Sequence, residues 1–81
     1  MLIYGLNNRL IDEVDSFGAW LRLALANSEM TQTDLAKKIR VCQTTVSGWT
    51  LNKNKPCYWA TVKLLCEIVD ADPELVWRKW F

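Results

Sequence analysis

The sequence predicts a small all-α domain of five helices, or of six if the first sixteen residues add one. Its 81 residues suffice for a single domain, and 51% of them are hydrophobic. Apolar residues recur at steps of three and four, which is the spacing of one helix face. Polar clusters that contain helix-capping residues separate these stripes. The pattern indicates short amphipathic helices around one compact core.

The first apolar stripe runs from about residue 8 to residue 27. Its members follow steps of four, three, four and three: Leu10, Val14, Phe17, Leu21 and Ala24. This spacing fits one long helix over 8–27. It equally fits a short helix that ends near Asp15, followed by a second helix that Ser16 caps.

The residues before this stripe are apolar and are interrupted by Gly5. We expect Leu2, Ile3 and Tyr4 to form a short strand or an extended arm. Such an arm either folds against its own domain or reaches a partner subunit.

Two short helices are predicted over 32–39 and 43–51, with a tight turn between them. Thr31 followed by Asp34 resembles a capping box at the start of the first helix. The second helix would bury Val46 and Trp49, which lie three residues apart. Its other side carries short, uncharged polar or small residues: Gln43, Thr44, Ser47 and Gly48. Amides and hydroxyls on an exposed helix face suit the major groove of DNA.

Two further helices complete the domain. The first is expected over about 58–69, from the stripe formed by Trp59, Val62, Leu65, Cys66 and Val69. The last begins at Asp72-Pro73-Glu74, which combines a cap, a first-position proline and an acid in the first turn. Trp49 and Trp59 lie on apolar faces, so both are expected in the core.

Four motifs occur in order along the chain: F-G-x-x-L-R from Phe17, T-Q-x-x-L-A from Thr31, V-x-Q-x-x-V-S-x-W from Val41, and K-P at Lys55. In this order and spacing they resemble the helix-turn-helix domain of the phage repressor and Cro-like DNA-binding family. The resemblance implies a compact repressor-like fold over 17–81 and leaves 1–16 as an N-terminal arm or extra helix.

The chain departs from the family pattern at three positions. Arg40 stands in the turn, where the family usually has glycine, and a positive φ there would cost roughly 1 kcal/mol. Cys42 and Cys57 stand where the family favours Ser or Thr before the next two helices. A thiol is a poor N-cap, so we expect both helix starts to be weak.

The resemblance implies two kinds of contact with double-stranded DNA. Base edges would be read from the helix 43–51 by Gln43, Thr44, Ser47 and Gly48. The DNA backbone would be contacted by Thr31, Gln32, Thr45, Asn52, Lys53, Asn54 and Lys55. In the family an amide pair such as Gln32 and Gln43 commonly meets, one bracing the other. The amide of Gln43 could then bond both N6 and N7 of adenine.

Charge is unevenly distributed along the chain. The net charge is only +1. However, the stretch from Lys37 to Lys63 contains six basic residues and no acidic one. This stretch includes the predicted reading helix, and it favours a negatively charged partner such as DNA.

Several functions find no support in the residues. There is no His, and Cys42, Cys57 and Cys66 form no C-x-x-C pair, so we expect free thiols and no metal or other cofactor. We find no catalytic constellation and predict that the protein is not an enzyme. No apolar run could span a membrane and no secretory signal is apparent, which predicts a cytoplasmic protein. The chain leaves no room for a ligand-sensing second domain, so we expect no small-molecule ligand.

The expected function is that of a small transcriptional repressor from a phage or mobile element. It would bind a palindromic operator as a homodimer, with Trp77, Trp80 and Phe81 of the last helix in the subunit interface. Alternatively, Trp77 and Phe81 close the small core. The same fold also serves antitoxins and controllers of restriction-modification operons. A protein-interaction module that has lost DNA binding is a further alternative.

Overall fold

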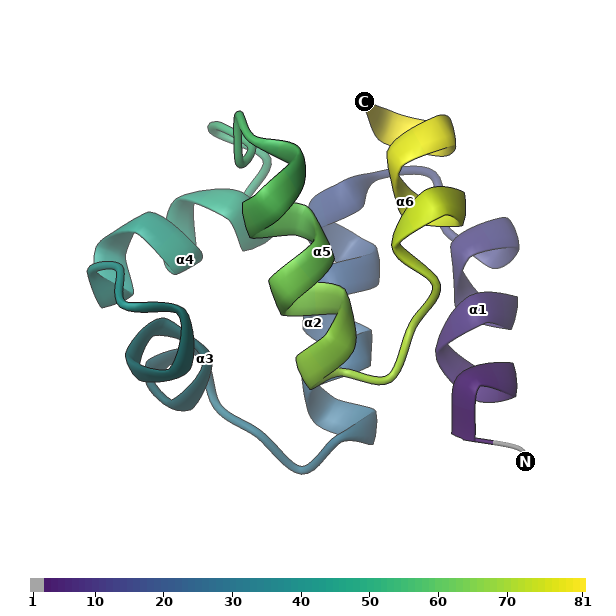
Figure 1. Ribbon diagram of the computed structural model, residues 1–81, viewed down its shortest axis with the longest axis horizontal. Coiled ribbons are helices and arrows are strands. Elements are labelled where there is room, and N and C mark those ends of the chain that lie inside the picture. The colour runs from purple at the N-terminus through teal and green to yellow at the C-terminus, as the bar shows by residue number, and fades with distance from the viewer. Residues whose placement is uncertain (1–2) are drawn as a thin grey trace.

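The computed structural model describes residues 3–81, and side chains from Asn7 onward. Over these residues the chain is all-α, as predicted, and has six helices (Figure 1). They are α1 (Ile3–Glu13), α2 (Phe17–Asn27), α3 (Gln32–Ile39), α4 (Gln43–Thr50), α5 (Trp59–Ile68) and α6 (Pro73–Trp80). In Figure 1, α3 and α4 lie at one end of the molecule and α1 at the other.

The N-terminal segment is helical. Because α1 already begins at Ile3, the prediction of a strand or an extended arm is wrong for Ile3 and Tyr4. The same prediction for Leu2 lies outside the described residues. Helix α1 packs on the domain through Ile11, which is buried in the core, and Leu10, which lies against it.

The first stripe is divided between two helices. Helix α1 ends at Glu13, and Ser16 is the N-cap of α2, accepting a hydrogen bond from the backbone N–H of Ala19 at 3.2 Å. This is the second of the two arrangements that the sequence allowed, so one long helix over 8–27 is excluded.

Two asparagines attach α1 to the rest of the fold. The buried side chain of Asn7 donates to the backbone oxygen of Val69. The indole of Trp20 donates to the backbone oxygen of Asn7 at 2.9 Å. The side chain of Asn8 accepts from the backbone N–H of Asp72 at 2.8 Å. Helix α1 is therefore an integral helix of the domain.

All six helices contribute to one core. Its largest fully buried apolar side chains are Trp20, Phe17, Leu21, Leu35, Leu65, Val46, Val62, Val69 and Val76. Cys66 is also buried, and desolvation, with smaller contributions from Asp72 and Glu67, raises the pKa of its thiol to about 12. The three cysteines are free, as predicted.

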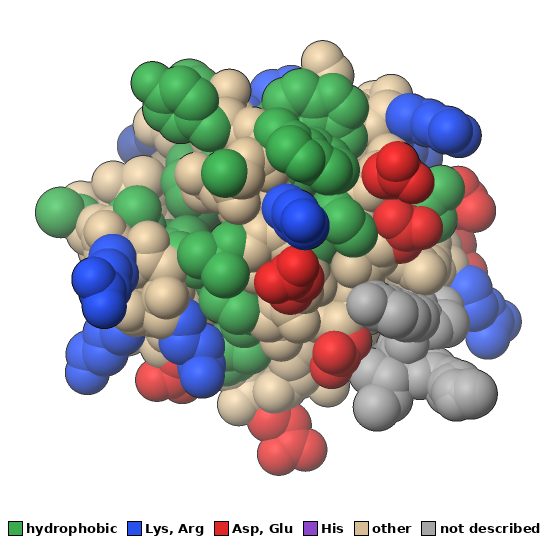
Figure 2. Space-filling view, in the orientation of Figure 1, with side chains coloured by type: hydrophobic (Ala, Val, Ile, Leu, Met, Phe, Trp, Pro, Cys, Tyr) green, Lys and Arg blue, Asp and Glu red, His purple; other side chains and the backbone are tan. Residues whose placement is uncertain are grey.

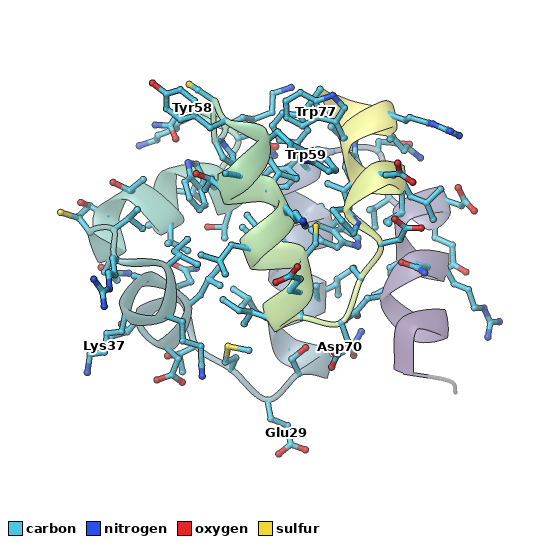
Figure 3. All side chains as sticks on the ribbon, in the orientation of Figure 1. Glu29, Lys37, Tyr58, Trp59, Asp70 and Trp77 are labelled. Atoms are coloured by element: carbon cyan, nitrogen blue, oxygen red, sulfur yellow. The ribbon has the colours of Figure 1, made fainter. Side chains whose placement is uncertain are left out.

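The two tryptophans expected in the core have different environments. Trp49 is 4% exposed, whereas Trp59 is 40% exposed. The prediction for Trp59 is therefore wrong. Trp59 is the first residue of α5, and its ring meets the edge of the Trp77 ring on α6, with centroids 5.5 Å apart (Figure 3). A stripe based on spacing alone does not show that the first turn of α5 extends beyond the core.

Helix ends follow the local sequence closely. Thr31 and Asp34 form the predicted capping box, and Asp72 accepts from the backbone N–H of Glu74. Arg40 has the left-handed backbone anticipated for the turn, with φ 63° and ψ 46°. Cys42 is an N-cap without a side-chain hydrogen bond, as expected of a thiol.

The start of α5 differs by one residue from the expectation. Tyr58, and not Cys57, is its N-cap, and it also makes no side-chain cap. The thiol of Cys57 lies near the backbone oxygen of Lys55, at 3.8 Å. It therefore faces the preceding loop and is turned away from the helix.

Helices α2 and α4 approach each other closely at Gly18. A Cβ on this residue would lie 2.6 Å from the backbone oxygen of Thr50 and 2.7 Å from that of Trp49. The backbone N–H of Gly18 donates to the side-chain oxygen of Asn52 at 2.9 Å. Only glycine permits this contact, because backbone carbonyls cannot move aside without displacing α4.

We expect Gly18→Ala to destabilise the fold by about 1–3 kcal/mol, the usual cost of overpacking a filled site. Urea unfolding followed by circular dichroism measures this change. Gly48→Ala is the matched control, because the Cβ there would meet only the exposed side chain of Asn54, at 3.0 Å. There the gain in helix propensity, up to about 1 kcal/mol, should make the change neutral or stabilising. Equal destabilisation by both variants would contradict this account of α2–α4 packing.

Candidate nucleic-acid interface

Helices α3 and α4 form the predicted pair joined by a tight turn. Leu35 and Ala36 of α3 and Val46 of α4 are buried in the common core. Ala36 is 3% exposed, and its small side chain lets the backbones of neighbouring helices approach. The left-handed Arg40 reverses the chain between the two helices. The first turns of α3 and α4 are thereby placed side by side.

The amides of Gln32 and Gln43 meet across these first turns, and the expectation that they would is confirmed. The side-chain nitrogen of Gln43 donates to the side-chain oxygen of Gln32, with 3.4 Å between the two atoms. Gln43 is exposed and Gln32 is half-buried. Gln43 therefore lies at the surface, and its side-chain NH2 group is held by Gln32.

Thr50 is a third member of this network, which the sequence reading missed. Its hydroxyl oxygen accepts from the side-chain nitrogen of Gln32 at 3.3 Å and donates to the backbone oxygen of Ser47 at 2.8 Å. The Thr50 side chain is fully buried at the end of α4. The available signal was a threonine among the apolar residues of a helix, where a buried hydroxyl needs partners.

The other predicted base-reading residues differ in exposure. Thr44 is exposed, and Ser47 is half-buried. Gly48 is buried, and the amide of Asn54 lies over the position that its Cβ would take. The surface that α4 presents is therefore centred on its first turn, at Gln43 and Thr44.

Three residues predicted to contact the DNA backbone lie at helix starts: Thr31 and Gln32 at the start of α3, and Thr45 in the first turn of α4. Thr45 is half-buried on α4. The exposed Thr31 accepts from the backbone N–H of Asp34 at 3.1 Å, and its own N–H donates to the Asp34 carboxylate at 3.2 Å. Hydrogen bonding from Thr31 to the Asp34 carboxylate, first of all from the Thr31 backbone N–H, lowers the pKa of this carboxyl group. At neutral pH this carboxylate is ionised and engaged in the capping box.

The loop over 51–56 follows α4, and its side chains make contacts within the domain. Asn52 has a left-handed backbone, with φ 61°, and its amide bridges the backbone N–H of Gly18 and the hydroxyl of Ser16. Asn54 lies over Gly48. Both asparagines are exposed, but the Asn52 amide is already engaged in hydrogen bonds within the domain.

The two loop lysines have different surroundings. The ammonium of Lys55 donates to the backbone oxygen of Trp80 at 2.7 Å and lies 5.3 Å from the centre of the Phe81 ring. Lys53 is exposed and makes no side-chain hydrogen bond within the described part of the chain. Lys53 can therefore reach a phosphate without giving up an internal contact, whereas Lys55 cannot.

Several basic side chains lie close together at one end of the molecule. Figure 2 shows a group of Lys and Arg side chains at the end formed by α3 and its turn, and further basic side chains over the rest of the view. Most of the acidic side chains in this view lie toward α5, α6 and α1. Lys37, Lys38 and Arg40 are all exposed. The local potential around the start of α4 is therefore more positive than the net charge of +1 suggests.

The C-terminal aromatic residues divide between core and surface. Trp80 packs on Phe17 and Trp20, with centroids 6.0 and 5.9 Å away, and its indole donates to the backbone oxygen of Asp15. Trp77 stacks on Phe81, which also meets the edge of the Phe17 ring. Trp77 and Phe81 thus pack in part against the core, which fits the alternative that they close it, and in part remain at the surface.

Apolar side chains remain exposed next to these rings. Tyr58 is 74% exposed, and Trp59, Leu75 and Phe81 are each about two-fifths exposed. We call Tyr58, Trp59, Trp77 and Phe81 the aromatic surface. Figure 3 shows Tyr58, Trp59 and Trp77 at the same end of the molecule, at the start of α5 and on α6.

Comparison with models of protein families, with curated proteins and with solved structures gave no match to this chain. Within the described residues no group of His, Cys, Asp or Glu side chains could hold a metal ion. No described helix has the length and apolar character that crossing a bilayer requires.

The contrast between the two loop lysines can be tested on the isolated protein. Lys55→Ala removes a charged hydrogen bond to the end of α6, so it should lower the free energy of unfolding by about 1 kcal/mol. Lys53→Ala, the matched control, should change it by less than about 0.5 kcal/mol. Urea unfolding monitored by tryptophan fluorescence measures both. If the two variants unfold alike, the contact between Lys55 and Trp80 has no energetic role.

Proposed function

We propose that this chain binds double-stranded DNA sequence-specifically, as a small transcriptional repressor of the Cro-like kind. The observation that carries the proposal is the exposed Gln43 amide on the first turn of α4, braced by Gln32 of α3. An amide held in this way at a helix start can enter the major groove and bond a base edge. This activity would place the protein in the cytoplasm.

The chemistry around Gln43 supports a groove-facing role for α4. Thr44 is exposed beside it and offers a hydroxyl and a methyl group, which can contact a base edge or a thymine methyl. Ser47 lies one turn further on and is half-buried. Because Asn54 covers Gly48, we assign base reading mainly to Gln43 and Thr44. Ser47 would contribute less.

Affinity would come from phosphate contacts around this helix. Lys53 on the loop after α4 and Lys37, Lys38 and Arg40 near the turn are exposed cations on the acid-free stretch. Cations of this kind position a protein on the duplex and carry no sequence information. Asn52 and Lys55 would contribute mainly by holding the loop against α2 and α6.

We further propose that the protein binds a palindromic site as a homodimer through the aromatic surface. Half-sites one helical turn apart are separated by about 34 Å. The molecule measures 30 × 23 × 21 Å, so the α4 helices of two adjacent copies could be separated by a distance of this order. The aromatic surface offers Trp and Tyr anchors of the kind that dominate interfaces. Trp80, in contrast to the sequence-based expectation, packs mainly within its own subunit.

The reading role of Gln43 is tested by selecting bound sequences from random DNA. Gln43→Ala should weaken binding to the selected site by about 1–3 kcal/mol and relax the preference at one base pair. Lys53→Ala is the contrasting control: it should weaken specific and random DNA alike and lower the salt slope by about one unit. An unchanged selected sequence with Gln43→Ala would mean that α4 does not read DNA.

The subunit interface is tested by analytical ultracentrifugation at tens of micromolar. Trp80 and Lys79 anchor α6 to α2 and α1, so the test leaves both in place. The variant is Tyr58→Glu, which adds charge at the most exposed residue of the aromatic surface. It should keep the helical content, sediment as a monomer and bind the palindrome more weakly. A wild-type chain that is monomeric and fills both half-sites without cooperativity would exclude the dimer.

A protein-interaction module that has lost DNA binding is the second candidate. The exposed aromatic surface favours it, because apolar patches of this kind mark interaction sites. The same selection from random DNA separates the two functions: an interaction module would retain no preferred DNA sequence.

A further inference from the structure

We propose that Thr50, which no DNA would touch, determines which base Gln43 reads by holding the two glutamine amides in one orientation. This inference rests on the proposed DNA-binding function and names a positioning residue for it. Thr50 is buried at the end of α4, while Gln43 is exposed at its start. Gln32 of α3 lies between them and contacts both.

The orientation of the two glutamine amides depends first on the hydroxyl proton of Thr50. That proton is donated to the backbone oxygen of Ser47, across 2.8 Å. This is the usual bond of a helical threonine to the preceding turn. A hydroxyl has one hydrogen, so the Thr50 oxygen can then only accept from its other neighbours. The neighbour available is the side chain of Gln32.

The Gln32 amide must therefore turn its NH2 group toward Thr50. The distance between the Gln32 nitrogen and the Thr50 oxygen is 3.3 Å. The reversed amide would set its carbonyl oxygen against a hydroxyl oxygen that has no proton left to give. With the NH2 group engaged, the carbonyl oxygen of Gln32 faces Gln43 and accepts from it at 3.4 Å.

The orientation of the Gln32 amide in turn fixes that of the Gln43 amide. Its NH2 group faces the carbonyl of Gln32, because two facing carbonyl oxygens would repel. The carbonyl oxygen of Gln43 and its second N–H remain for a ligand. Adenine presents a donor at N6 and an acceptor at N7, which this pair of groups complements. Guanine presents two acceptors, N7 and O6, so it can use only the N–H.

Thr50→Val tests the inference because it replaces the hydroxyl by a methyl group of nearly the same shape. The backbone oxygen of Ser47 still accepts from the Leu51 N–H at 3.1 Å, so α4 keeps its last turn. In binding to duplexes that differ at one base pair, the preference for adenine opposite Gln43 should fall about tenfold. Preferences at other base pairs and affinity for random DNA should not change.

Two further variants distinguish positioning from a general effect on the fold. Thr50→Ser retains the hydroxyl and should restore most of the adenine preference. Thr61→Val makes the same chemical change at a half-buried position on α5 and should leave the preference unaltered. If Thr50→Val weakens all sequences equally and lowers the unfolding temperature, Thr50 has only a structural role and the inference is wrong.

A measurement on the free protein separates this inference from the proposed function. In ¹⁵N-resolved NMR, Thr50→Val should shift the side-chain NH2 signals of both Gln32 and Gln43, whereas Thr61→Val should shift neither. If Gln43→Ala changes the selected sequence and Thr50→Val changes neither the signals nor the preference, the inference fails and DNA reading stands. If the wild-type chain selects no DNA sequence, both fail, whatever the NMR signals show.

Discussion

The close contact between α2 and α4 at Gly18 is the constraint on which the candidate interface depends. Without a Cβ at Gly18, the carbonyl ends of Trp49 and Thr50 lie directly against α2. The Asn52 amide then completes the contact by accepting from the Gly18 N–H and donating to Ser16. Because α4 is short, fixing its C-terminal turn also fixes the direction in which its first turn projects from the domain.

Thr50 connects this packing contact to the surface. Its backbone oxygen lies closest to Gly18, whereas its hydroxyl meets Gln32, so one residue takes part in both the α2–α4 contact and the amide network. The polar groups that orient Gln43 are thus attached to the most constrained part of the fold. Groups built on helices in this way are held more closely than groups on loops.

The loop after α4 is anchored on both sides, and this divides its residues between structure and ligand contact. Asn52 attaches its first half to α2, and Lys55 attaches its second half to the end of α6. Lys53 lies between the two anchors and extends into solvent. Helix α6 is itself held by Trp80 against the rings of α2, so the loop, α2 and α6 form one continuous packed unit.

The sequence alone determined the helices α3 to α6 and most of their ends, because apolar spacing and capping act within a few residues. It left open whether the first stripe forms one helix or two, and it missed the helical start of α1. The resemblance to repressors indicated the turn at Arg40. The resemblance to repressors also anticipated the meeting of Gln32 and Gln43. Only the tertiary structure decided that Trp59 is exposed, that Asn52 and Lys55 are engaged internally, and that Thr50 completes the amide network. These contacts join residues 18 to 36 positions apart, such as Gln32 with Thr50, Lys55 with Trp80 and Ser16 with Asn52. Their partners depend on how helices pack, and local sequence patterns carry no information about that choice.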